Sequence, residues 1–169
     1  MVDRSALEAV YEPGSFGAAN SGLVISERRG LRIQSVATLA DYLGDRPSLA
    51  TDGSRILTIS PDRWLVIGQT PEPAAPGLAI NDVGFGRTVI RIEGPAVRDV
   101  LAKGCPLDLH PAAFGPDSSA QTLLGHFTVL IDCVAPETFD IFINRSFAED
   151  FWGWLTRASA EYGYKVSAI

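Results

Sequence analysis

The sequence predicts an α+β protein built from two imperfect ferredoxin-like units, with helices packed on antiparallel or mixed sheets. Two observations support this prediction. The second half of the chain reads strand, helix, strands, helix, strand, and the first half shows a shorter version of that order. Between them, residues 69–77 carry three prolines and a glycine, typical of a surface connection. We expect one domain over residues 1–169, with halves roughly at 20–80 and 81–169. A single mixed sheet stays an alternative.

The first half contains four segments with the apolar and β-branched content of strands. Residues 23–27 and 31–36 flank an Arg-Arg-Gly turn, which predicts a hairpin. Residues 55–60 and 64–67 flank the turn-favouring triplet Ser-Pro-Asp. We expect this second hairpin at the centre of its sheet, because both of its faces are apolar. Residues 39–43 are a candidate for a short amphipathic helix.

The second half begins with a strand and a helix. Residues 87–93 alternate between apolar and charged side chains, which predicts a half-buried strand. Gly94-Pro95 then opens a helix, and Gly104 closes it. Residues 105–117 hold three prolines, so we expect no regular element there.

Further strands and the longest helix complete the second half. Residues 121–124 and 127–132 form a strand pair around a Gly-His turn, in which His126 faces solvent. Residues 138–144 alternate again, and residues 164–168 are a final short strand.

The longest helix begins at Ser146, which with Glu149 matches a capping box. Its spacing predicts a buried face made of Phe147, Phe151, Leu155 and Ala158. Trp152 points partly away from that face. Two interpretations stay open for it: an exposed anchor for a partner protein, or part of a wide buried stripe under a neighbouring loop.

Composition excludes several classes of protein. The net charge of −6 and the scattered basic residues argue against a nucleic-acid partner. No apolar run approaches the roughly 20 residues that span a bilayer, and the mixed N-terminal segment lacks the layout of a signal peptide. Cys105 and Cys133 fit free thiols in a reducing compartment. We therefore expect a cytoplasmic protein without a membrane partner.

The sequence offers one weak candidate for catalysis. Cys105, Asp108 and His110 can be written as a nucleophile, an orienting acid and a base. However, Cys105 directly follows a helix-ending glycine, a common place for a small buried side chain. The sequence also lacks a phosphate-binding loop, a dinucleotide fingerprint and the Cys/His spacing of a zinc site. We therefore predict no catalytic, cofactor-binding or metal-binding residue.

Three segments carry a family resemblance. The run GPAVRDVLAKGCPLDLHPAAFGPDSSAQTLLGHFTVLI and the later TFDIFINRSFAEDFWGWL closely resemble the gamma subunits of heterotetrameric sarcosine oxidases. The upstream SPDRWLVIG is also similar to a segment of that family. Together the matches cover roughly residues 55–165. The resemblance implies a fold related to the folate-binding domain of the glycine-cleavage T-protein, the aminomethyltransferase.

The resemblance also implies a role. Such oxidases demethylate sarcosine to glycine in sarcosine catabolism, and a gamma subunit is expected to be a non-catalytic assembly component beside alpha, beta and delta subunits. FAD, FMN, NAD and tetrahydrofolate are expected in the partner subunits, and zinc in delta. Two alternatives remain: a small folate- or amine-binding module, and a subunit of a related N-methyl amino acid dehydrogenase complex.

The matched motif also suggests where a partner subunit docks. A proline-stiffened loop loses little entropy when a partner immobilises it. The proposed interface consists of Trp152 together with Cys105, Pro106, Leu107, Asp108, Leu109, His110 and Phe114. The alternative is that the loop covers the protein's own core.

Overall fold

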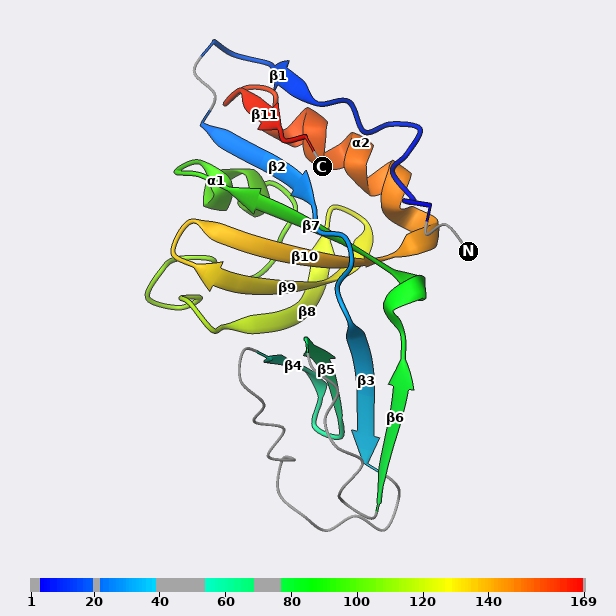
Figure 1. Cartoon of the computed structure of the whole chain (residues 1–169). Helices are drawn as coiled ribbons and strands as arrows, with labels where there is room; N and C mark the ends of the chain where they lie inside the picture. The colour runs from blue at the N-terminus through cyan, green and yellow to red at the C-terminus, as the bar shows by residue number, and fades with distance from the viewer. Residues whose placement is uncertain (1–3, 20–21, 39–53, 69–76, 169) are drawn as a thin grey trace. The chain divides into compact units, whose positions relative to one another are not determined.

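A computed structural model describes residues 4–19, 22–38, 54–68 and 77–168 (Figure 1). The chain divides into two compact units, each described here by itself. The first combines residues 1–29 with 86–169, and the second comprises residues 30–85. Both units are built on sheets, and helices pack on the sheet of the first. The predicted α+β class with antiparallel and mixed sheets is confirmed.

The first unit contains a seven-stranded sheet. Its strands, in spatial order, are β1 (Gly14–Phe16), β11 (Tyr164–Val166), β2 (Leu23–Glu27), β7 (Arg87–Glu93), β10 (Thr138–Asn144), β9 (Phe127–Ala135) and β8 (Ser119–Leu124). All neighbouring pairs are antiparallel except β11 and β2, which are parallel. The sheet therefore places β1, from the first part of the chain, beside β11, from the last part (Figure 1).

Two helices pack on one face of this sheet. They are α1 (Val97–Ala102) and α2 (Ala148–Ser159). Their apolar side chains share one core with the alternating residues of β7, β9 and β10, including Ile90, Ile131 and Ile141, which are fully buried. This core holds the first unit together, because burial of apolar area is the main favourable term in folding.

The second unit contains a four-stranded antiparallel sheet. Its spatial order is β4 (Arg55–Ser60), β5 (Arg63–Ile67), β3 (Ile33–Thr38) and β6 (Leu78–Asp82). One face buries Val36, Trp64 and Val66 together. The predicted hairpin of β4 and β5 is confirmed, although only β5 is an interior strand. The helix predicted at residues 39–43 and most of the proline-rich connection lie outside the described residues.

The hairpin predicted for residues 23–27 and 31–36 is wrong. β2 pairs with β7 and β11 in the first unit, whereas β3 pairs with β5 and β6 in the second. Leu23 and Ile25 are buried in the core under α1 and α2, and this burial outweighs the local preference for a tight turn. The compact units consequently follow different bounds from the predicted halves.

The regular elements predicted for the second half are all present. A 3-10 turn, η1 (Gly84–Gly86), precedes β7, and α1 follows β7 as expected. Gly104, just beyond the C-cap residue Lys103 of α1, is a glycine because neighbours approach closely there. A Cβ at Gly104 would lie 2.5 Å from both the Gly125 nitrogen and Trp154 Cζ2.

The predicted start of the longest helix is wrong in detail. A 3-10 turn, η2 (Arg145–Phe147), precedes α2, and the residue at its N-cap is Phe147, without a side-chain capping hydrogen bond. Ser146 and Glu149 therefore form no capping box. The changed helical phase also turns Phe147 outward, to an exposure of 51%, while Phe151 and Leu155 are buried as predicted.

Candidate interaction surface

The loop predicted to dock a partner follows α1 and is irregular, as expected. In one of its tight turns, the backbone nitrogens of Ala113 and Phe114 both donate to the His110 carbonyl at 2.8 Å. This turn is held by contacts within the loop itself.

Arg98, a half-buried residue of α1, hydrogen-bonds to the backbone of this loop. Its guanidinium donates to the Leu109 carbonyl, to the Phe114 carbonyl at 2.9 Å and to the Pro136 carbonyl at 2.9 Å. It also lies 5.0 Å from the centroid of the Phe139 ring, a cation–π geometry. One charged group thus joins the loop to the turn between β9 and β10 through charge-assisted hydrogen bonds. The matched motif includes Arg98, but the sequence alone did not predict this role.

The apolar residues of the loop belong to the core of the first unit. Phe114 is 7% exposed and lies 6.3 Å from Phe139 between ring centroids, and Leu109 is also buried. Leu107 and Cys105 are half-buried against the same core. The prediction that Leu109 and Phe114 offer apolar contacts to a partner is therefore corrected, whereas the half-buried Leu107 stays a prediction. The exposed part of the predicted interface consists of Pro106, Asp108 and His110.

The polar residues of the loop hydrogen-bond to their own backbone. Asp108 Oδ1 accepts the His110 N–H at 2.9 Å, and His110 Nδ1 accepts the Ala112 N–H at 3.2 Å. The Cys105 sulfur lies 3.9 Å from Thr122 Oγ1. Asp108 and His110 thus stabilise the loop, whereas Cys105 lies against β8.

The thiols and possible metal ligands give no further candidate. Neither Cys105 nor Cys133 forms a disulfide, as predicted. In residues 4–19, 22–38, 54–68 and 77–168, no three His, Cys, Asp or Glu side chains are grouped as metal ligands would be.

Trp152 is covered by the N-terminal segment. It is 5% exposed, and its ring centroid lies 5.1 Å from that of Tyr11. Of the two interpretations of this tryptophan, the buried stripe under a neighbouring segment is therefore correct, and the exposed anchor is wrong. Leu7, fully buried in the same core, fixes the segment from a second position.

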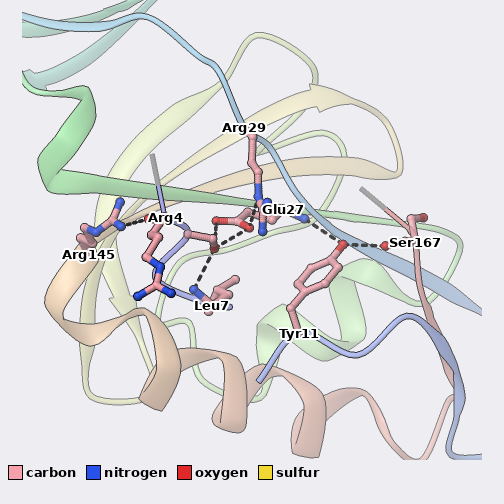
Figure 2. Close-up of polar contacts among 8 residues, drawn as sticks. Arg4, Leu7, Tyr11, Glu27, Arg29, Arg145 and Ser167 are labelled. Carbon is pink, nitrogen blue, oxygen red and sulfur yellow. Dashed lines mark hydrogen bonds and ion pairs between the residues drawn. The ribbon is translucent and has the colours of Figure 1, made fainter. Parts of the chain in front are cut away.

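Polar contacts complete the attachment of the N-terminal segment (Figure 2). The Tyr11 hydroxyl donates to the Ser167 carbonyl at 2.7 Å and accepts the Glu27 N–H at 3.3 Å. Burial raises the pKa of Tyr11 above its ordinary value. Ser5 Oγ donates to the Glu27 carboxylate at 2.6 Å, and Arg29 Nε donates to it at 2.7 Å. This attachment was not predicted from the sequence, although the spacing of Leu7 and Tyr11 is that of one helical face.

A charged pair lies on the sheet of the first unit. Arg91 donates to both carboxylate oxygens of Asp140, at 2.7 and 2.8 Å, and Arg28 lies 3.7 Å from the same carboxylate. This hydrogen bonding raises the pKa of Arg91. The charges are matched across neighbouring strands, which is a structural arrangement.

The fold is shared with two solved structures. One is a chain of the heterotetrameric sarcosine oxidase from Corynebacterium sp. U-96 in complex with pyrrole 2-carboxylate. It has a TM-score of 0.80 and 22% identity, and the match covers 96% of this chain and 97% of that one. The other is glycine cleavage system aminomethyltransferase T from Bartonella henselae, with a TM-score of 0.56 and 11% identity over 88% of this chain and 48% of that one. At these identities the likeness defines the class of fold.

The sequence then defines the family. Residues 48–161 match the sarcosine oxidase, gamma subunit family. A sarcosine oxidase subunit gamma from Corynebacterium sp. strain P-1 is 33% identical over 67% of this chain, and that of strain U-96 is 30% identical over 89%. This chain belongs to the sarcosine oxidase gamma subunit family, as the resemblance predicted. The matches span 60% of the length of the P-1 relative and 72% of the U-96 relative.

Within the described residues, no helix has the length and apolar character needed to cross a membrane.

Proposed function

We propose that this chain is the gamma-type subunit of a heterotetrameric sarcosine oxidase, and that its role is assembly rather than catalysis. The observation that carries the proposal is membership of the gamma subunit family over residues 48–161. Its partners are alpha, beta and delta subunits, and FAD, FMN, NAD, tetrahydrofolate and zinc belong to them. The free thiols of Cys105 and Cys133 support a cytoplasmic location.

The contacts of the candidate residues support a non-catalytic role. General acid–base catalysis requires a group placed to exchange a proton with substrate. Asp108 and His110 instead use side-chain acceptors to hold backbone N–H groups of their own loop. The best-organised charged group, Arg98, is directed at three carbonyls of the same unit.

Reconstitution of the complex tests the proposal. The chain is co-expressed with the alpha, beta and delta subunits of its own organism, and the purified complex is assayed for sarcosine-dependent hydrogen peroxide. We expect a stable complex, and we expect the flavin to remain with the larger chains when the subunits are separated after denaturation. We also expect a lower yield of active complex when this chain is omitted. Flavin binding by this chain alone, or oxidation of sarcosine by this chain alone, would contradict the non-catalytic role. A substrate panel that includes N-methylglutamate decides which N-methyl amine is used.

A binding module is the second candidate. A small cavity of about 150 Å³ lies beside Trp152 and Tyr164, with Glu12 at its edge. An acidic group next to aromatic rings suits a small amine. However, ligand sites usually have volumes of roughly 300–1,000 Å³, so this cavity is too small for a folate. Calorimetric titration of the isolated chain with tetrahydrofolate and with sarcosine tests this candidate, since micromolar binding of either would contradict a purely assembling role.

A further inference from the structure

The start of α2 carries an exposed aromatic side chain. Phe147 lies in η2 and is 51% exposed, although Phe151, one turn further on, is fully buried. A single exposed apolar residue is common in folded proteins and indicates nothing by itself. Phe147, however, forms one wall of a hollow.

The hollow has a volume of about 340 Å³ and lies between the β8–β9 turn, the adjoining ends of β9 and β10, and the first turn of α2. Its lining residues are His126, Phe127, Thr128, Asn144, Phe147 and Asp150. We call this site the Phe147 hollow.

Two rings are in contact in a tilted arrangement at the Phe147 hollow. The ring of exposed His126 lies 4.0 Å from that of buried Phe127 between centroids, with an angle of 34° between their planes. Leu123, which is 46% exposed, is directly opposite Thr128 in the register of β8 and β9. Apolar area therefore continues from the hollow onto the neighbouring edge strand, where a partner could cover it.

The Phe147 hollow also contains a carboxylate. Asp150 lies in the first turn of α2, is exposed and lines the hollow. Among the ion pairs of the described residues, none involves Asp150. A carboxylate beside exposed rings complements a side chain that is apolar along its length and cationic at its end. Arginine fits best, because its planar guanidinium both stacks on rings and pairs with a carboxylate in a bidentate way.

We propose that the Phe147 hollow receives an arginine side chain from a segment of a partner subunit, with its guanidinium on Asp150 and its methylene groups against Phe147 and His126. This inference rests on the proposed function, because it identifies the surface through which the subunit assembles. It places the interface on the first unit, away from the buried side chains of the loop after α1.

Two exposed substitutions with matched controls test the proposal in the co-expressed complex. Phe147→Ser and Asp150→Asn each remove one recognition group, and we expect each to weaken association with the partner subunits about tenfold or more. Phe85→Ser removes an exposed phenylalanine of the second unit that is 73% exposed, and Glu149→Gln removes the neighbouring carboxylate, which does not line the hollow. We expect both controls to assemble as the wild type does.

Cross-linking identifies the occupant. A photo-reactive phenylalanine analogue at position 147 should form a cross-link to a larger subunit within a few residues of an arginine. A cross-link to a second copy of this chain, or unchanged assembly of both Phe147→Ser and Asp150→Asn, overturns the proposal. If the wild-type chain binds no partner subunit at all, the proposed function fails. If the wild type assembles and both variants assemble equally well, only this inference fails.

Discussion

The loop after α1 and the start of α2 differ from what their residue patterns predict, in opposite directions. The loop is rich in proline and lies between regular elements, which is typical of an exposed segment, yet Phe114 is buried in it. The start of α2 has the spacing of a buried face, yet Phe147 is exposed. The difference shows that a proline-rich loop can contribute buried side chains to the core, and that a single 3-10 turn can leave an apolar residue exposed at a helix start. Three substitutions test this comparison.

The largest effect is expected from removing the phenylalanine of the loop. Phe114→Ala should lower the free energy of unfolding by about 3 kcal/mol, because it leaves a cavity beside Phe139. Phe147→Ala, the matched control at an exposed site, should change it by less than about 0.5 kcal/mol. Urea unfolding of the isolated chain measures both. Equal losses in the two variants would show that the regions do not differ in burial.

The second effect is expected at the charged group that holds the loop. Arg98→Lys should lower the free energy of unfolding by about 2 kcal/mol, because one ammonium group cannot reach all three carbonyls that the guanidinium contacts. Hydrogen exchange should become faster at the turn formed by His110, Ala113 and Phe114. Arg157→Lys, at an exposed position on α2, is the control. Unchanged exchange in the loop would mean that Arg98 does not determine its conformation.

The smallest effect on the free energy of unfolding is expected at the N-terminal segment. This segment covers Trp152, and the loop after α1 likewise packs Phe114 against the core. Tyr11→Phe removes a hydroxyl that bonds to the Ser167 carbonyl, so we expect a loss of about 1 kcal/mol at neutral pH.

The same substitution should change the pH dependence of stability. Burial raises the pKa of Tyr11 in the folded state. The unfolded tyrosine therefore ionises first as pH rises past about 10, and the contribution of Tyr11 to stability is lost as pH increases through the folded-state pKa. Thermal melts across this window should show a shallower decline in Tyr11→Phe than in the wild type. Parallel declines would mean that the Tyr11 hydroxyl is as accessible in the folded state as in the unfolded one.

Much of the fold could be predicted from local pattern. β7, β9 and β10 alternate with a period of two, and this period places Ile90, Ile131 and Ile141 on one face whatever their neighbours are. The family was also recognisable, because the motif around Arg98 and Cys105 is long and contiguous. The candidate interface was harder to predict, since exposure depends on segments that are distant in sequence.

The sequence by itself determined the α+β class, most of the strands and helices, and the family. These depend on short-range periodicity and on contiguous motifs. Only the tertiary structure decided that β2 pairs with β7 and β11, that Arg98 hydrogen-bonds to the Phe114 carbonyl of the loop, that the N-terminal segment covers Trp152 and that Phe147 faces outward. The physical reason is that burial is shared between residues far apart along the chain, so no local pattern specifies it.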